Sequence, residues 1–485
     1  MSPLQICILI NYILCLFVIL DMIFIRKKKV ERILAWIIFL IIPFVGLFIY
    51  LVLGSGLDGF NKHNIKKLMV ASREYNNHIK TQTQFLTNGN DTKYPDDVKE
   101  MILFNLKNAD SLYSSHNDIK YFLDGQSALD SLIADIKGAK SSIHIEFYIF
   151  ANDKTGRIVR KILTEKAKEG VEVRVLYDAV GSITTSKINF RKLIKAGGKV
   201  CQFLPPFLGM PLLNFKANYR NHRKICVIDG KVAYTGGFNL RDDHMGKDKK
   251  LYPWRDTTIR VEGTSISSFQ NIFLSDWRFA TKDKVELKEY FTPKYFPKNA
   301  SISKNVPMQV IKSGPESSNE EIKACIVKMI TSAKKYVRIQ TPYFVPDDTV
   351  FGAIKLALLS GVQVELMIPE KMDHFLVHFA NYSYINDLLP FGLKVYVYKG
   401  FIHSKVVLVD DKIITIGSCN IDIRSFALNF EANVVIYGEE ETQNYYKIYD
   451  KDISNCEIYD LEKSNKKNIF FRMLTSFSRL FSNVL

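Results

Sequence analysis

The sequence is poor in cysteine, and its few cysteines are scattered. Seven occur among 485 residues, an odd number, and no two of them stand in CxxC spacing. They are Cys7, Cys15, Cys201, Cys226, Cys325, Cys419 and Cys456. This distribution argues against a disulfide framework and against a cysteine zinc site. We expect most of these thiols to be buried.

Acidic residues are scarce relative to basic ones. Lys and Arg number 66 against 50 Asp and Glu, which gives a formal net charge of +16. Such a surface attracts anions, either phospholipid headgroups or nucleic acid, and net charge alone does not separate the two. The length and the 47% hydrophobic content leave room for more than one large core.

Long apolar runs fill the N-terminal part. Residues 4–25 and 33–53 each approach the roughly 20 residues that a helix needs to cross a bilayer. The basic segment 26–32 joins them, so we expect a transmembrane hairpin over 1–54. A cleaved signal peptide is the alternative, but no basic residue precedes the first run and no small-residue cleavage site precedes the second. Basic residues also follow the second run, so the membrane side of the large domain stays open. Residues 55–118 have polar stretches without sustained apolar periodicity, which predicts a tether.

The remainder of the chain reads twice in the same order. The copies pair 139–150 with 333–344, 170–176 with 361–367, and 198–200 with 392–395. Each copy alternates strand-like with helix-like segments, which predicts an α/β fold with mixed sheets flanked by helices. We expect two similar lobes, 119–300 and 301–460, related by a pseudo-two-fold axis and sharing one composite site at their junction.

Each copy carries an HxKxxxxD motif. The first motif consists of His222, Lys224 and Asp229, and the second of His403, Lys405 and Asp410. Residues i and i+2 of a strand share a face, so each histidine and its lysine project toward one ligand. The aspartate is an odd number of positions from the histidine and stands between two strand-like runs. We therefore weigh a turn role above a catalytic role for both aspartates.

Two histidines suit the cleavage of a phosphodiester. One can attack phosphorus while the other protonates the departing alkoxide, and the ordinary histidine pKa of about 6.5 permits both states near neutral pH. Asp256 and Glu431, at comparable places after the motifs, are the candidates to orient the two rings. Asn239 and Asn420 lie equally far after the two histidines. With the motif lysines, they are the candidates to stabilise charge on the phosphoryl oxygens.

These motifs resemble the paired HKD motifs of the phospholipase D superfamily, and the resemblance spans about Ile119 to Tyr459. The segments 417–425 and 429–431 look like the usual continuation of the second motif. In the first copy Gly237 replaces the small hydroxyl residue and Asp256 replaces the glutamate. The superfamily includes nucleases, phospholipases and phosphatidyltransferases, so the motifs alone leave the reaction open.

The N-terminal spans narrow the resemblance to bacterial cardiolipin synthases, as do residues 43–47, Tyr50 and the segment 254–256. The resemblance implies a multi-pass protein of the bacterial cell membrane whose partners are phosphatidylglycerol and anionic lipid, with no nucleic acid. It implies that His222 attacks phosphatidylglycerol, releases glycerol and holds the phosphatidyl group until a second phosphatidylglycerol accepts it. His403 then serves first as acid and afterwards as base. The alternatives are phospholipid hydrolysis at the same site and, from another class, a membrane-tethered phosphodiesterase or nuclease.

This scheme requires no cofactor and no metal. His374 and His378 have the spacing to share a helix face but lack an evident third ligand, so we expect ordinary helix residues. The apolar segment 207–213 either lines an acyl-chain entrance or folds into the core. Residues 461–485 predict a basic amphipathic helix, which lies either on anionic lipid or on the protein itself. The oligomeric state stays open.

Overall fold

The computed structural model describes residues 2–20, 42–46, 73–88, 96–205, 219–282, 287–297, 304–317 and 319–482. Helix α1 (Pro3–Leu20) is, within those residues, the one helix that is long and apolar enough to cross a membrane. Most of the second predicted span, 33–53, lies outside the described residues, and so does the basic segment 26–32. The apolar segment 207–213 lies outside them too.

The first half of the body is built on a mixed sheet in the order β2-β10-β8-β7-β3-β4-β5. The strands are β2 (Asn117–Phe122), β3 (Ser142–Phe147), β4 (Glu172–Asp178), β5 (Lys199–Phe203), β7 (Lys224–Ile228), β8 (Val232–Gly236) and β10 (Thr258–Gly263). The neighbours β3, β4 and β5 are parallel and the other pairs are antiparallel. The helices of this half are α7 (Gly125–Gly138), α8 (Lys154–Lys168), α9 (Arg191–Lys195) and α10 (Ile266–Thr281).

The second half repeats this order strand for strand. Its sheet runs β11-β20-β18-β17-β12-β14-β15, with β1 (Tyr113–Ser114) and β21 (Cys456–Tyr459) added at the two edges. The strands are β11 (Met308–Ser313), β12 (Tyr336–Gln340), β14 (Gln363–Pro369), β15 (Lys394–Tyr398), β17 (Val406–Val409), β18 (Ile413–Gly417) and β20 (Asn429–Tyr437). The helices are α11 (Glu321–Ser332), α12 (Asp348–Leu359), α13 (Phe375–Leu388), α14 (Ile423–Ala427), α15 (Glu439–Ile453), α16 (Leu461–Asn465) and α17 (Ile469–Leu480). The expected α/β class with mixed sheets is confirmed.

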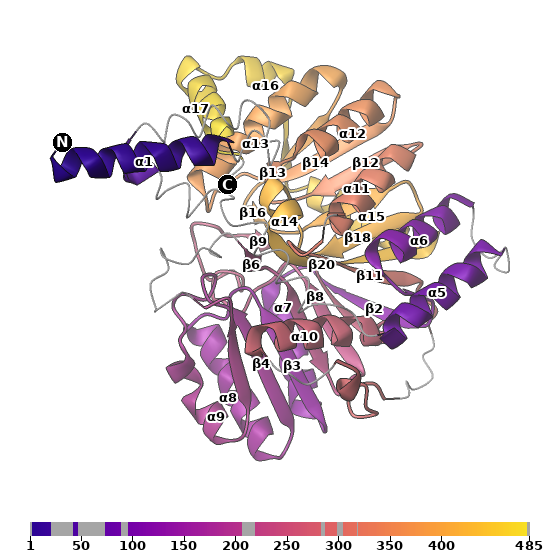
Figure 1. Cartoon of the computed structure of the whole chain (residues 1–485). Coiled ribbons are helices and arrows are strands. Elements are labelled where there is room, and N and C mark those ends of the chain that lie inside the picture. The colour runs from indigo at the N-terminus through magenta and orange to yellow at the C-terminus, as the bar shows by residue number, and fades with distance from the viewer. Residues whose placement is uncertain are drawn as a thin grey trace.

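The two sheets share one apolar core, which explains their continuous runs of β-branched residues. Ile225 and Val227 of β7 join the same buried cluster as Val406 and Leu408 of β17. The alternate residue Cys226 instead joins the core under the first-half helices, because successive strand side chains point to opposite faces. The halves are therefore stacked on one another, as Figure 1 shows by the purple and the orange-to-yellow parts.

Two short strand pairs cross between the halves. β6 (Arg220–Asn221) runs parallel to β20, and β9 (Trp254–Arg255) runs parallel to β16 (Phe401–Ile402). A further pair, β13 (Phe344–Val345) with β19 (Ile421–Asp422), lies within the second half. Short 3-10 turns occur at Lys187–Phe190, Leu287–Tyr290 and Leu389–Phe391. The crossing pairs stand immediately before the two motif histidines.

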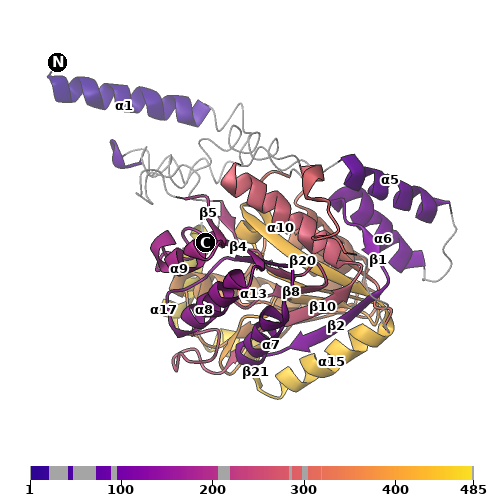
Figure 2. The same ribbon diagram turned by 90° about the horizontal axis from the view of Figure 1, so that it is seen from below.

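The segment 55–118, expected to be a tether and entry segment, is largely helical where the structure describes it. Helices α5 (Arg73–Thr87) and α6 (Asp96–Ala109) lie side by side in both views (Figures 1 and 2). They pack on the second half, because the apolar stripe of α6, including Met101 and Leu106, joins the core under α11 and α12. Asn105 also donates to the Tyr437 hydroxyl at 3.0 Å. The sequence did not predict this helix, because polar stretches dominate the segment that precedes it.

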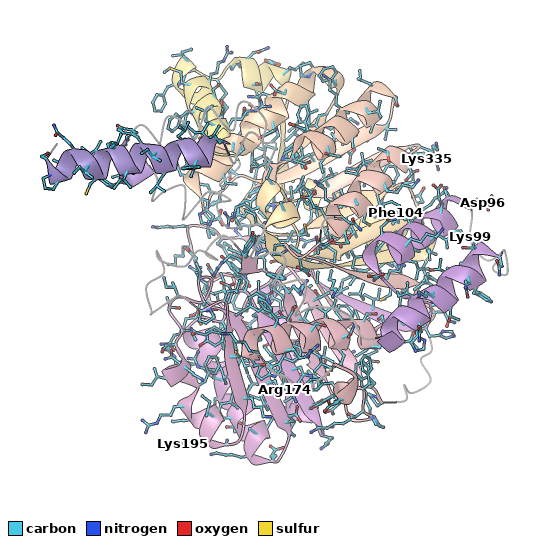
Figure 3. All side chains as sticks on the ribbon, viewed as in Figure 1. Asp96, Lys99, Phe104, Arg174, Lys195 and Lys335 are labelled. Atoms are coloured by element: carbon cyan, nitrogen blue, oxygen red, sulfur yellow. The ribbon has the colours of Figure 1, made fainter. Side chains whose placement is uncertain are left out.

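Aromatic side chains enclose cations in the outer layers as well. Arg174 of β4, labelled in Figure 3, donates to the Tyr295 hydroxyl at 2.9 Å and pairs with Glu172 at 2.8 Å. Its guanidinium also lies 5.6 Å from the ring centre of Trp277. This enclosure gives the buried Arg174 guanidinium a carboxylate, a hydroxyl and an aromatic ring as partners.

Candidate active site

The two motif histidines line one cavity. Its volume is about 850 Å³, and His222 and His403 line it together with Asn239 and Asn420. Each half of the chain thus contributes one imidazole and one amide. The structure brings together these four predicted residues, which lie far apart in the sequence.

The first histidine is held by the second half of the chain. The His222 backbone N–H donates to the Phe430 carbonyl at 2.9 Å, which continues the pairing of β6 with β20. Its Nδ1 lies 2.9 and 3.0 Å from the two carboxylate oxygens of Glu431. A carboxylate accepts, so Nδ1 carries the proton and Nε2 keeps its lone pair.

The second histidine repeats the arrangement in the opposite direction. The His403 N–H donates to the Arg255 carbonyl at 2.7 Å, and its Nδ1 lies 2.8 Å from Oδ2 of Asp256. The predicted acceptors are therefore in place, and they are crossed. Each imidazole is oriented by the carboxylate of the other half.

The two carboxylates have different surroundings. The Ser418 hydroxyl donates to Glu431 at 2.5 Å. At the equivalent position the first half has Gly237, where a Cβ would lie 2.0 Å from Oδ1 of Asp256. Asp is one methylene shorter than Glu, so its carboxylate lies against the backbone and only glycine leaves room. Gly237 and Asp256, the two residues in which the first half differs from the second here, therefore depend on each other.

The motif lysines are buried behind the histidines. Nζ of Lys224 donates to the His222 carbonyl at 2.6 Å, and Nζ of Lys405 donates to the His403 carbonyl. Burial lowers the pKa of Lys405 to about 8, against the opposing effect of Asp256 and Glu431. Burial, with repulsion from Lys405, also holds the pKa of Lys224 well below its ordinary value.

These cations and the burial together set the state of the imidazoles. Burial, with the charges of Lys224 and Lys405, lowers the pKa of His222 to about 4 although Glu431 opposes the shift. Burial and the same lysines hold the pKa of His403 well below its ordinary value. Burial opposes ionisation of Glu431, but His222, Lys224 and Ser418 outweigh it, so the pKa of this carboxyl lies below its usual range. Burial raises the pKa of Asp256 instead. At neutral pH the site therefore holds neutral imidazoles amid positive charge, an environment suited to a phosphodiester anion.

A third histidine that the sequence analysis missed stands beside His403. His244 is buried, with Nδ1 3.9 Å from Asp256 and its ring centre 5.0 Å from that of His403. It also contacts the Asn239 amide at 3.2 Å. It lies five positions after Asn239, where the second half has Ser425 five positions after Asn420. Extending the repeat comparison past the asparagines would have revealed an imidazole in place of a hydroxyl.

The motif aspartates hold turns and do not touch the imidazoles. The Asp229 carboxylate accepts from the backbone N–H groups of Lys140, Ser141 and Ser142 at 2.7 to 2.9 Å. Asp410 accepts in the same way from Lys334, Lys335 and Tyr336 at 2.8 to 3.0 Å. Both have positive φ, 52° and 48°, which Asp tolerates better than most residues. This geometry favours a structural role in the turns over a direct role in catalysis for both aspartates.

One cluster in the described chain has a geometry that a metal could use. Ligand atoms of His244, Asp256 and His403 lie within 4.8 Å of one another. Asp256 already accepts the His403 proton, however, which makes this an acid–base pair rather than an open ligand set. His374, expected on a helix, instead precedes α13, and its side chain is mostly exposed.

The cavity lining combines apolar and charged side chains. The exposed Met372 and Phe375 lie at its rim, and Leu376 and the buried Val377 line it beside them. The lining cations are Arg220, Arg241, Lys250 and Arg424, and the lining carboxylates are Asp243, Asp248, Asp373 and Asp422. Apolar side chains and cations in one cleft fit a molecule with acyl chains and an anionic headgroup.

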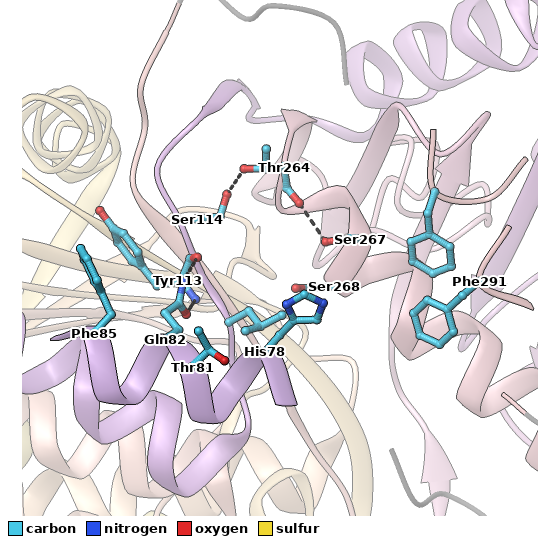
Figure 4. A pocket seen from close by; sticks show the side chains of 12 residues that line it. His78, Thr81, Gln82, Phe85, Tyr113, Ser114, Thr264, Ser267, Ser268 and Phe291 are labelled. Carbon is cyan, nitrogen blue, oxygen red and sulfur yellow. Dashed lines mark hydrogen bonds between the residues drawn. The ribbon is translucent and has the colours of Figure 1, made fainter. Parts of the chain in front are cut away.

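A second hollow of about 660 Å³ lies between α5 and the start of α10 (Figure 4). Phe85 and Phe291 contribute apolar surface, and Ser267 and Thr264 contribute hydroxyls. None of its described lining residues also lines the cleft that contains His222 and His403, and it has a single imidazole, His78. It does not contain the two-histidine constellation.

Two His-x-Lys motifs that meet at a cleft between similar α/β halves define the phospholipase D class. Residues 132–277 and 326–453 match the family described as cardiolipin synthase, PLD-like domain, and residues 13–55 match the phospholipase D-nuclease N-terminal family. The chain belongs to the cardiolipin synthase family.

Related proteins align over nearly their whole length. The chain is 38% identical to a cardiolipin synthase of Oceanobacillus iheyensis, covering 98% of both chains. It is 37% identical to one of Listeria welshimeri, covering 98% of this chain and 100% of the relative. The crystal structure of phosphatidylserine synthase from Haemophilus influenzae Rd KW20 has the same fold. It matches with a TM-score of 0.61 and 16% identity, over 80% of this chain and 100% of that chain.

Proposed function

We propose that this protein is a cardiolipin synthase, which transfers a phosphatidyl group from one phosphatidylglycerol to another and releases glycerol. One observation carries the proposal: His222 and His403 line one cavity, and each is held through Nδ1 by a carboxylate of the other half. Two oriented imidazoles around one cleft supply a nucleophile and an acid at the same time.

The reaction proceeds in two balanced steps. Nε2 of His222 attacks phosphorus, and the bond from phosphorus to the glycerol oxygen breaks. His403, which takes up a proton at Nε2 when the phosphodiester anion binds beside it, gives that proton to the leaving oxygen. The phosphohistidine then reacts with a hydroxyl of the second phosphatidylglycerol, whose proton passes to His403. The new phosphorus–oxygen bond forms as the phosphorus–nitrogen bond breaks, which restores both imidazoles.

The surroundings of Glu431 support His222 as the nucleophile. A phosphorylated imidazole is positively charged, and Glu431, whose lowered pKa keeps it ionised, lies 2.9 Å from Nδ1. Asn239 and Asn420 line the cavity, and Lys224 and Lys405 lie behind the histidines, so these four residues are the candidates to compensate charge on the non-bridging oxygens, the lysines through their charge. This assignment extends the family likeness to individual residues.

Product analysis tests the reaction. Full-length protein reconstituted in vesicles of phosphatidylglycerol should form cardiolipin and glycerol in equal amounts. Phosphatidic acid as the sole lipid product would assign a hydrolase, and cleavage of DNA without lipid turnover would assign a nuclease. The His222→Ala and His403→Ala variants should each lose cardiolipin formation.

A better leaving group separates the two histidines. Phosphatidyl-p-nitrophenol releases a phenolate that needs no protonation, so His403→Ala should retain a burst of about one equivalent as the phosphohistidine forms. His222→Ala should give no burst. The reverse result would exchange the two roles.

We also propose the chain organisation that the sequence suggests: a two-span hairpin over 1–54, a connecting segment over 55–118, and pseudo-two-fold lobes over 119–300 and 301–460. The identical strand orders support the lobes. Buried Asn11 of α1, which accepts from the Phe44 N–H at 3.1 Å, supports a hairpin, because it joins the first run to the second. Topology reporters fused after residues 28 and 60 should lie on opposite sides of the membrane.

A further inference from the structure

Helix α17 has two apolar faces, and its own protein covers one of them. On the covered face the Phe471 ring lies 5.5 Å from the rings of both Phe379 and Tyr382 of α13. Thr475 and Ser478 are buried on the same side. The helix is therefore docked on the second half, one of the two alternatives that its sequence offered.

The opposite face exposes an apolar stripe. It consists of Ile469, Phe470, Met473, Phe477 and Leu480, and each of these side chains is more than half exposed. At 3.6 residues per turn, they fall within a sector of about 100°. Docking on α13 does not use this stripe, so it requires a partner other than the protein's own core.

The charges around the stripe favour an anionic partner. The segment 461–482 has five basic residues and one acidic residue. Arg479 anchors the helix by pairing with Asp387 at 2.5 Å, and Lys467 lies over the Phe471 ring. An apolar sector flanked by cations is the pattern of a helix that lies in a membrane interface.

The docked face of α17, on the other side of the helix from the stripe, is connected to the mouth of the active-site cleft. Phe375 lines the cleft and is 54% exposed. Its ring lies 4.8 Å from that of Phe379, which in turn contacts Phe471 of α17. Exposed Met372 adjoins it on the rim. One aromatic row thus links the rim to the docked face of α17.

We propose that α17 is a membrane-docking helix, whose apolar stripe enters the headgroup–acyl boundary of an anionic bilayer and holds the cleft rim against it. A lipid then passes from the bilayer over Met372 and Phe375 to the histidines without crossing water. The docking surface is independent of the assignment of the reaction, because it would serve a hydrolase equally well.

Quenching by brominated lipid tests the contact. Phe470→Trp, in the full chain reconstituted in phosphatidylglycerol vesicles, adds fluorescence that lipids brominated on the acyl chain should quench. Ile188→Trp is the control, because Ile188 is equally exposed and lies in the 3-10 turn that directly precedes α9. Figure 1 shows α9 at the end of the body away from α17. Signals are taken as differences from the parent protein. Equal quenching of the two added tryptophans, or none at Phe470→Trp, would overturn the proposal.

A comparison of substrates tests its consequence. The double variant Phe470→Ser/Phe477→Ser should lose about tenfold in turnover of vesicle phosphatidylglycerol and retain turnover of a short-chain analogue dissolved as monomers. Ile188→Ser should change neither. No loss with vesicles, or equal loss with both substrates, contradicts the proposal. If the double variant turns a dimer into a monomer and Phe470→Trp shows no lipid quenching, the stripe is a contact between two copies of the protein, which also contradicts the proposal. Quenching needs no turnover, so it stays decisive even if the protein makes no cardiolipin.

Discussion

His222 and Glu431 belong to different halves of the chain, and Nδ1 of the histidine lies 2.9 Å from the carboxylate. His403 and Asp256 reverse the relationship at 2.8 Å. Neither half therefore holds an oriented imidazole by itself. The halves share a core as well, so the seam that closes the site also stabilises the fold.

The crossed carboxylates should have separable effects. Glu431→Gln keeps an acceptor for the His222 proton but removes the charge that stabilises phosphohistidine, so the p-nitrophenol burst should slow by about 10²-fold. Asp256→Asn removes the charge that favours protonated His403, so fewer molecules hold the proton that glycerol needs. Turnover of phosphatidylglycerol should slow by a similar factor, and the burst should be spared. Stopped-flow measurements with both substrates check this. An equal effect of Asp256→Asn on both substrates would contradict the assignment of His222 as nucleophile and His403 as acid.

The motif aspartates should affect stability rather than chemistry. Asp410→Ala leaves three backbone N–H groups without their acceptor and places alanine at a φ of 48°. We expect a loss of about 2–4 kcal/mol in the free energy of unfolding and a lower Tm. Turnover per folded molecule should stay within about threefold, whereas His403→Ala should abolish turnover and keep the Tm. A catalytically dead Asp410→Ala with an unchanged Tm would contradict the turn role.

The sequence was sufficient to predict the repeat, the mixed sheets and the four histidine and carboxylate positions at the site, because each depends on local spacing. It did not predict which carboxylate meets which histidine. That choice follows from the stacking of two sheets through Ile225, Val227, Val406 and Leu408, residues that look alike in any buried strand. Crossing is a property of the packed pair and is not encoded in either motif.

The connecting segment and His244 escaped prediction for other reasons. Helix α6 is short and follows polar stretches, and which of its apolar residues are buried is clear only beside the core of the second half that it covers. His244 follows a loop without strand or helix periodicity, and the fold alone brings it to Asp256. The repeat comparison marks position 244 as different from Ser425, but only the structure shows that its imidazole meets Asp256.

His244 should act as a positioning residue for His403. Burial holds the pKa of His244 well below its ordinary value, so the ring is a neutral support at neutral pH. His244→Ser installs the side chain of the equivalent Ser425 and removes that support. We expect kcat for phosphatidylglycerol to fall about tenfold with KM little changed and with the p-nitrophenol burst retained. Ser425→Ala is the matched control. Loss of the burst in His244→Ser would show that the residue acts on His222 instead.

The pH dependence of the burst should report His222 and Lys405. With p-nitrophenol as leaving group no acid is needed, so the rate at low substrate depends on a neutral nucleophile and a cationic site. The pKa of His222 is about 4, so the rate should be lost as pH falls through that value. The pKa of Lys405 is about 8, and deprotonation removes a charge that attracts the phosphodiester, so the rate should decline as pH rises above 8. In Lys405→Arg the guanidinium stays charged, so the rate should no longer decline at alkaline pH, even if the maximal rate of the variant differs from that of the wild type. Because Lys224 couples to Lys405, the observed midpoints belong to the pair.

A wild-type rate that stays level to pH 10 would mean that Lys405 keeps its proton in spite of its burial, and the electrostatic account of the site would then fail.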